Sequence, residues 1–213
     1  MLEGYEIGNN GAIRQTRIGE IMRYDREYIA QRYIPIAEKC REMASLRLGV
    51  LCGALGFDPS HLNILDVGYG SGEFLAAAKN VFASAHGHDI TGINPPEGVT
   101  FEENIFADKF DVVTFFDVLE HFQEPSVIQH LRCSFVMISL PWCHYKSDEW
   151  FRDWKHRRPD EHLWHFDSAA LVESMQDWGF APITQPMSIE DSIRGRLDGS
   201  ANILTMVFRK CGR

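Results

Sequence analysis

Residues 64–75 read ILDVGYGSGEFL. Apolar, strand-forming residues end at Val67, glycines follow at positions 68, 70 and 72, and a helix-forming run begins at Glu73. Glycine allows the backbone to turn sharply and leaves room for a ligand where a Cβ atom would clash. A strand, a glycine-rich turn and a helix in this order are typical of nucleotide-binding α/β proteins.

Two carboxylates add to the significance of this glycine loop. Its spacing is G-x-G-x-G, one position shorter than the dinucleotide fingerprint G-x-G-x-x-G, and a glycine triplet also serves as a structural turn. Asp66 lies inside the strand end, where a buried carboxylate is costly unless it holds N–H groups or a cation. Asp89 ends the next apolar segment, where a carboxylate can accept hydrogen bonds from ribose hydroxyls. We therefore favour a cofactor site over a structural turn.

The segments around the loop predict a parallel sheet. Short apolar runs bounded by turn residues are typical of buried parallel strands, and they occur at 63–67, 83–89, 98–102, 111–116 and 134–140. Residues 181–189 and 202–210 predict an antiparallel hairpin at the sheet edge. Helices are expected at 72–82, 124–131 and 168–178, the last with Asp167 as its N-cap. Only nine residues join Asp89 to Val99, so we expect the crossover helices on both sides of the third strand to be missing.

The N-terminal quarter differs in pattern. Apolar residues between Tyr24 and Leu55 recur at spacings of three to four, which predicts helices interrupted at Pro35. Residues 1–20 are rich in glycine and asparagine at first and predict a loose arm. We expect an arm and helical cap over residues 1–57, and a cofactor-binding domain over residues 58–213.

Composition excludes several classes of partner. The net charge of −9 argues against binding of duplex nucleic acid and for a small-molecule or protein substrate. The apolar run at 135–140 is too short to span a membrane, and the first residues lack the apolar core of a signal peptide. Five scattered cysteines fit reduced thiols. We expect a cytoplasmic protein with no nucleic-acid or membrane partner; its oligomeric state has no signature in the sequence.

In their order along the chain, the motifs resemble those of the class I S-adenosylmethionine (SAM)-dependent methyltransferases, in particular small-molecule enzymes of the ubiquinone-biosynthesis type. The matching stretches are LDVGYGSGEFL, GHDI (87–90), FDVVTFFDVLEHFQEP (110–125), ISLP (138–141) and EHLWHFD, and they span roughly residues 60–210. The resemblance implies a Rossmann-like, seven-stranded, mostly parallel sheet that ends in an antiparallel hairpin. It also implies SAM as cofactor, S-adenosylhomocysteine (SAH) as product, and O- or N-methylation of a small-molecule acceptor.

The same resemblance implies a set of cofactor-binding residues. Asp66 and the loop residues Gly68, Tyr69, Gly70 and Gly72 would line the methionine part of SAM. Asp89 with Ile90 would hold the ribose, and the backbone around Phe116 and Asp117 the methionine amine. The family usually places an acidic or amide residue against the adenine after the third strand, and Asn104 is the candidate here. Tyr24 and Tyr28 are candidate contacts from an N-terminal helix folded over SAM, with core packing as the alternative.

The aromatic segment after the fifth strand is the candidate acceptor site. All five tryptophans and four of the nine histidines lie between residues 142 and 178, and enzymes of this kind cover the acceptor with an insertion here. We expect a lid at about 142–167, with Trp142, Trp154, Arg157, Arg158 and His165 as acceptor contacts. Candidate proton acceptors are His121, His144 and His162, in that order. For each histidine the alternative is packing, with a hydrogen bond to a backbone carbonyl.

Other readings of these residues remain. His162 and His165 with His156 and Asp160 nearby are possible zinc ligands, but HExxH and paired cysteines are missing and a sulfonium donor needs no Lewis acid. We therefore expect no metal. An NAD-dependent oxidoreductase would share the glycines and the ribose acid, although the glycine spacing and the hairpin argue against it. A non-catalytic SAM-binding or interaction module would share every motif, because none is diagnostic of turnover.

Overall fold

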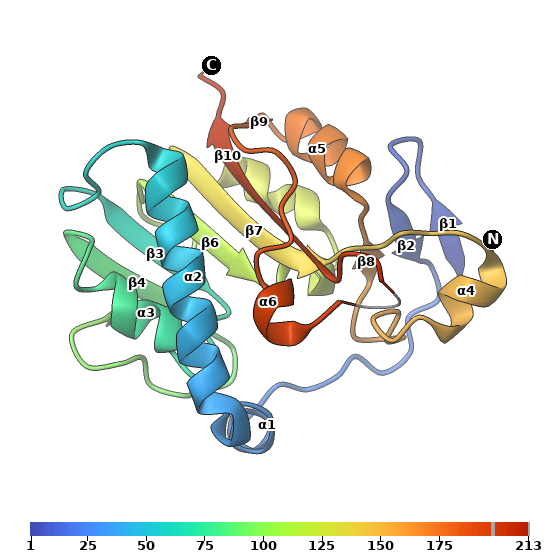
Figure 1. Cartoon of the computed structure of the whole chain (residues 1–213), viewed down its shortest axis with the longest axis horizontal. Helices are drawn as coiled ribbons and strands as arrows, with labels where there is room; N and C mark the ends of the chain where they lie inside the picture. The colour runs from blue at the N-terminus through green and yellow to red at the C-terminus, as the bar shows by residue number, and fades with distance from the viewer. Residues whose placement is uncertain (197–198, 213) are drawn as a thin grey trace.

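The computed structural model describes residues 1–196 and 199–212. Its centre is a seven-stranded sheet in the order β5-β4-β3-β6-β7-β10-β9 (Figure 1). The strands are β3 (Asn63–Val67), β4 (Ser84–His88), β5 (Thr100–Phe101), β6 (Val112–Phe116), β7 (Phe135–Pro141), β9 (Phe180–Pro182) and β10 (Ile203–Lys210). Strands β3 to β7 pair in parallel, and β10 runs antiparallel to β7 and β9. The expected Rossmann-like sheet with an antiparallel C-terminal hairpin is confirmed.

Helices cover both faces of this sheet (Figure 1). The α-helices are α1 (Arg26–Arg32), α2 (Ala37–Leu55), α3 (Glu73–Ala78), α4 (Asp148–Asp153), α5 (Ser168–Asp177) and α6 (Asp191–Arg194). The 3-10 helices are η1 (Ile34–Ile36), η2 (Leu119–His121) and η3 (Pro125–His130). The described chain has no helix between β4 and β5 or between β5 and β6, as the short crossovers predict. None of the helices in the described ranges is both long enough and apolar enough to cross a membrane.

Two predicted helices differ from the observed ones. The segment 124–131 forms the 3-10 helix η3 rather than an α-helix, a conformation common in short connectors of about one or two turns. The helix predicted over 72–82 ends at Ala78, and the following residues turn back toward β4. The helix over 168–178 is confirmed as α5, and the Asp167 carboxylate accepts a hydrogen bond from the Ala170 N–H as its N-cap.

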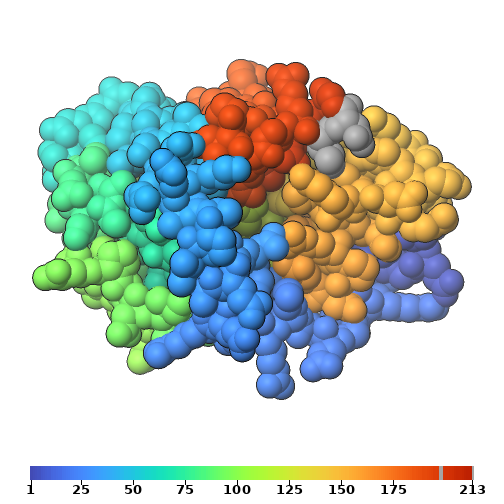
Figure 2. Space-filling model, turned by 60° about the horizontal axis from the view of Figure 1, so that its bottom comes forward, coloured from blue at the N-terminus to red at the C-terminus, as the bar shows by residue number. Residues whose placement is uncertain are grey.

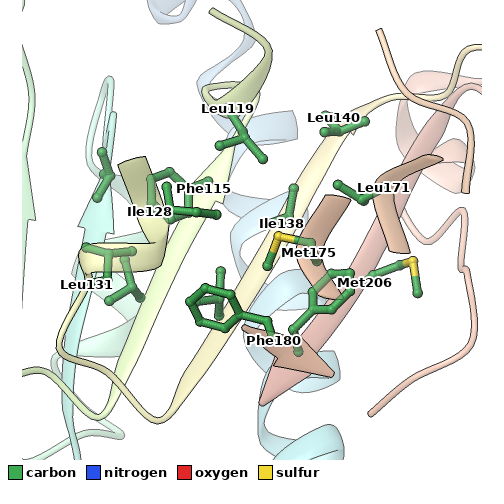
Figure 3. Close-up of a cluster of buried hydrophobic side chains, with 14 of the residues drawn as sticks. Phe115, Leu119, Ile128, Leu131, Ile138, Leu140, Leu171, Met175, Phe180 and Met206 are labelled. Carbon is green, nitrogen blue, oxygen red and sulfur yellow. The ribbon is translucent and has the colours of Figure 1, made fainter. Parts of the chain in front are cut away.

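The core is divided by the sheet into two clusters because side chains alternate along each strand. In β6, Val113 and Phe115 belong to the cluster covered by α5 and η3, whereas Val112 and Phe116 belong to the cluster under α2 and α3. Figure 3 shows the first cluster, in which Ile138 and Phe115 from the sheet meet side chains of the two covering helices. Both clusters are closely packed and apolar, so the sheet is a rigid support for the loops at its edge.

A row of polar side chains interrupts the α2-covered face near the carboxyl ends of the strands. The Thr114 hydroxyl donates to Asp66 Oδ1 at 2.7 Å, and the hydroxyls of Ser139 and Thr205 lie 2.8 Å apart. All four side chains are buried. Buried polar groups are tolerated only when they are paired, and here each finds its partner on the neighbouring strand. Only Asp66 keeps a carboxylate oxygen available for a group above the sheet edge.

The expectation of a loose arm over residues 1–20 is wrong. Strands β1 (Tyr5–Ile7) and β2 (Ile13–Gln15) form a hairpin that pairs with β8 (Trp164–His165) in a second, three-stranded sheet. The buried Gln15 fixes this sheet to the segment before β8. Its Nε2 donates to Asp160 Oδ1 at 2.7 Å, and its Oε1 accepts from the Asp160 N–H at 2.9 Å. Strands of two or three residues are too short to show a recognisable alternation.

We predict that Gln15→Ala lowers the free energy of unfolding by about 1–3 kcal/mol, because it removes the two hydrogen bonds that the buried Gln15 side chain makes with Asp160. Urea denaturation followed by circular dichroism measures the change. Gln176→Ala, on the exposed face of α5, is the matched control and should change stability by under about 0.5 kcal/mol. Equal stability of both variants would show that the hairpin is not anchored through Gln15.

Candidate functional site

A cavity of about 560 Å³ opens where β3, β4 and β6 end. Its floor is made of the glycine loop and the residues that follow β4 and β6, such as Gly70, Asp89 and Val118. The N-terminal helices contribute Tyr28 and other side chains, and the 142–167 segment and α6 close the remaining sides. Figure 2 shows the surface hollowed between the blue N-terminal helices, the orange segment and the red C-terminal part. Ligands of open α/β sheets bind at this edge.

The glycine loop is held open by one carboxylate. Gly68, Gly70 and Gly72 all have positive φ, and a Cβ atom on Gly68 would lie 2.3 Å from a methyl group of Val118. Asp89 Oδ2 accepts the Gly70 N–H at 2.8 Å. Asp89 Oδ1 accepts the Thr91 N–H, also at 2.8 Å. The carboxylate thus ties the loop after β3 to the loop after β4 and fixes the floor of the cavity.

A smaller cavity lies behind the loop and carries two unusual charged groups. Asp66 is 2% exposed, and burial raises its pKa to about 7 despite the hydrogen bond from Thr114. Arg47, from α2, donates from Nε to Glu190 at 2.6 Å, but its Nη2 is buried without a hydrogen-bond partner among the described residues. Asp66 therefore favours a cationic group that would ionise it. Arg47 Nη2 lies 3.6 Å from Asp117 Oδ2, beyond hydrogen-bond distance, and can still donate a hydrogen bond to an anion.

An ion network holds Arg47 and the residue after β6 in place. Arg194 of α6 donates to both oxygens of Asp117 and pairs with Glu190 at 2.7 Å. Burial alone would raise the pKa of Asp117, but Arg194 and Arg47 outweigh it, so that pKa lies below its usual range. Asp117 has a φ of 56°, a strained conformation for a non-glycine residue that the bidentate Arg194 contact over-determines. The network fixes the junction between the two cavities.

Two neutral histidines face the larger cavity beside this junction. Burial lowers the pKa values of His121 and His162, so both rings are uncharged at neutral pH. His121 Nδ1 lies 2.8 Å from the carbonyl of Glu161, and His162 Nδ1 lies 2.8 Å from that of His156. Since a carbonyl can only accept, we assign the proton of each ring to Nδ1. Each Nε2 then carries a free lone pair.

Comparison with known families identifies the fold and its class. A family model described as a methyltransferase domain matches residues 28–185, which is well over half of the chain. The chain belongs to this methyltransferase family. The resemblance found in the sequence, to the class I SAM-dependent methyltransferases, is confirmed. No curated protein matches the chain.

Solved structures that match this methyltransferase share its fold at low sequence identity. The 1,6-didemethyltoxoflavin-N1-methyltransferase of Burkholderia thailandensis, solved with SAH, has a TM-score of 0.56 at 16% identity, over 98% of this chain and 99% of that one. The magnesium protoporphyrin IX methyltransferase of Synechocystis PCC 6803, also with SAH, has 0.54 at 16% identity, over 82% and 85%. A chain from a Haloferax volcanii complex of a methyltransferase with the Trm112 activator has 0.58 at 14% identity, over 90% and 100%.

Most of the residues predicted for the cofactor are brought together. Those that line one of the two cavities are Tyr24, Tyr28, Asp66, Gly68, Tyr69, Gly70, Asp89, Ile90, Phe116 and Asp117. Gly72 does not line either cavity. A Cβ atom at this position would lie 2.7 Å from the Pro96 ring, so glycine makes room for Pro96. Asn104 also lies outside, in a turn in which its Oδ1 accepts from the Phe106 N–H, while its neighbour Ile105 lines the larger cavity.

The predicted lid of the methyltransferase divides into two sets of side chains. His156, Arg158, Glu161 and His162 line the cavity. Trp154 and His165 are buried on the other side, against Phe151 and Tyr5. Trp142 stacks on His144, whose Nε2 donates to the carbonyl of Ala201. Arg157 lies over the ring of Tyr5. Trp142, His144 and Arg157 therefore do not line the cavity. Of the three candidate proton acceptors, His121 and His162 line the cavity and His144 does not.

Sequence reasoning did not identify several residues of this site. Arg47, Glu190 and Arg194 lie in segments without a motif and meet only through the fold. Glu120 lies within the motif FDVVTFFDVLEHFQEP but has no role predicted from sequence, although it is 1% exposed and lies beside His121. Tyr33 lines both cavities. A charged residue on the otherwise apolar side of α2 was the one available signal for Arg47.

Asp66 gives a prediction about pH. Because its folded-state pKa of about 7 lies above the unfolded value near 4, its contribution to the free energy of unfolding falls as pH rises between those values. Asp66→Asn removes that dependence. The free energy of unfolding of the variant minus that of the wild type should therefore increase by about 2 kcal/mol between pH 5 and pH 8 in urea titrations. A difference that stays constant or decreases would contradict the assignment.

Proposed function

We propose that this methyltransferase transfers a methyl group from SAM to a small molecule enclosed between the glycine loop and the lid. The observation that carries the proposal is the junction of two unlike cavities. One ends in a buried carboxylate and a guanidinium Nη2 that has no hydrogen-bond partner among the described residues, and the other has the neutral histidines His121 and His162 in its wall. The first suits the amino-acid end of SAM and the second an acceptor that must lose a proton.

The residues around the glycine loop fit SAM in charge and shape. The methionine ammonium would favour ionised Asp66, and the methionine carboxylate would satisfy the buried Nη2 of Arg47. Gly68 and Gly70 leave the floor free of Cβ atoms at the crossing between the cavities. Asp89 and Ile90 lie where β4 ends, which is the ribose position in this class of sheet. The SAH bound in the two related structures supports this assignment.

The acceptor side favours a small, largely apolar molecule. A cavity of about 560 Å³ is in the range of ordinary small-ligand sites. Tyr24, Tyr28 and Met22 cover it from the N-terminal segment, and the lid covers it from the other side. A folded protein or a duplex would not reach the histidines past these residues. The Burkholderia and Synechocystis enzymes, whose names specify small-molecule substrates, support the same conclusion.

The chain would contribute positioning and a proton acceptor. When bound, SAM supplies a methyl group on a sulfonium: a lone pair of the acceptor forms the bond to carbon while the carbon–sulfur electron pair returns to sulfur. The floor around Gly70 and Asp117 would set the direction of approach, which accounts for much of the catalysis of such displacements. His121 Nε2 would take the proton of a hydroxyl or amine, and Tyr24, 2.9 Å from Nδ1, would keep the ring in place.

We predict that Asp89→Asn weakens SAM and SAH binding by roughly tenfold or more, because an amide places an N–H against that of Gly70 or Thr91. Calorimetry measures both affinities. The control is Asp58→Asn, since exposed Asp58 also accepts two hydrogen bonds, from Ser60, and lies far from the cavity. Unchanged affinity of the Asp89 variant would refute the proposed cofactor site.

We predict that His121→Asn lowers the rate of SAH formation about 100-fold or more at saturating SAM, because the acceptor then loses its proton acceptor. The assay follows SAH by mass spectrometry with a panel of hydroxyl and amine compounds, and SAM affinity should stay unchanged. Exposed His130→Asn is the control and should retain wild-type turnover. A wild-type protein that binds SAM but forms no SAH with any compound would favour a non-catalytic module instead.

A further inference from the structure

The burial of the Glu120 carboxyl group is not explained by hydrogen bonds from the residues around it. Its side chain is 1% exposed, and neither carboxylate oxygen has a hydrogen-bond partner within the described residues. A buried carboxyl group without partners is strongly unfavourable. The Leu163 N–H donates a hydrogen bond to the Glu120 carbonyl at 2.8 Å, and this bond holds Glu120 against the predicted lid.

Two histidines converge on this carboxylate. Glu120, His121 and His162 each offer one atom, and these three atoms all lie within 4.8 Å of one another. His121 Nε2 is 3.9 Å from Glu120 Oε1, and the two imidazole rings meet edge to face with centroids 4.7 Å apart. An ion with bonds of about 2.1 Å needs ligand atoms about 3.4 Å apart, so small side-chain rotations would complete the site.

The second hydrogen bond of each histidine suits a metal ligand. Metal-binding histidines characteristically donate their other ring N–H to a carbonyl or carboxylate, which fixes the ring and directs the lone pair. Both rings do so here, to the carbonyls of Glu161 and His156.

We propose that Glu120, His121 and His162 bind one divalent cation of the zinc class in the wall of the larger cavity. Two imidazole nitrogens and one carboxylate form the ligand set of catalytic zinc sites, which keep further positions open. The same set disfavours Mg²⁺ and Ca²⁺, which prefer oxygen ligands. From the sequence we expected no metal. The ligands proposed here were not apparent there, because His121 and His162 are 41 positions apart and meet only in the fold.

The open positions would face the acceptor, since His121 and His162 both line the cavity. This role rests on the proposed function, and it narrows the acceptor to a hydroxyl compound whose oxygen binds the ion. The ion lowers the pKa of that hydroxyl, and its proton passes to water. The oxygen lone pair then bonds to the methyl carbon as the carbon–sulfur electron pair returns to sulfur. The ion would thus replace His121 as the group that activates the acceptor.

The test is direct metal binding by untagged, EDTA-treated protein. Calorimetry with Zn²⁺ and with Mg²⁺, and metal content after dialysis against Zn²⁺, should give one tightly held zinc per chain and no measurable Mg²⁺ binding. Glu120→Gln and His162→Ala should each weaken Zn²⁺ binding at least tenfold, while exposed His61→Ala should not change it. Glu120→Gln keeps the size and shape of the side chain, so loss of folding would not obscure the result.

SAH titration of the same samples separates this inference from the proposed function. SAH binding without stoichiometric Zn²⁺ binding would overturn the metal site and leave methyl transfer in place. Zn²⁺ binding that is equally strong in Glu120→Gln would overturn the assignment of ligands. Turnover that is lost in EDTA and restored by Zn²⁺ would support the ion as the activating group, and turnover unaffected by EDTA would return that role to free His121.

Discussion

The site depends on the carboxylate of Asp89, which accepts the N–H groups of Gly70 and Thr91 at once. This contact joins the loops that follow β3 and β4, and it holds glycines at positive φ in a shape that other residues could not adopt without strain. Because the sheet beneath is packed on both faces, the loop has a rigid base. The cavity, the Asp66 carboxylate below it and the histidines beyond it are all placed relative to this floor.

The lid is a second structural constraint, and its aromatic composition reflects packing more than chemistry. Trp154 and His165 are buried against Phe151, whereas His156 and His162 line the cavity. The N-terminal hairpin secures the segment through Gln15 and Asp160. The Leu163 N–H donates to the Glu120 carbonyl, and the His121 ring donates from Nδ1 to the Glu161 carbonyl. These two hydrogen bonds connect the segment to the sheet edge, so that His121 and His162 meet.

Much of the fold could be predicted from sequence because strands such as 63–67 and 111–116 are short, largely apolar runs with turn residues at both ends. The glycine loop and Asp89 were found for the same reason: their chemistry is local. The N-terminal hairpin could not be predicted, since its strands are three residues long and its third partner is β8. Arg47, Arg194 and Glu120 were missed because their significance comes from contacts between distant segments. The orientation of the histidines in the predicted lid could not be predicted either, because the strand in this segment, β8, has only two residues.

The most direct test of the central claim is a crystal structure of the protein soaked with SAH. The account predicts density across the glycine loop, with the amino-acid end between Asp66 and Arg47, the sugar beside Asp89 and the sulfur directed toward His121 and His162. Density at another face of the molecule, or an empty cavity at saturating SAH, would contradict the assignment of this sheet edge as the cofactor site.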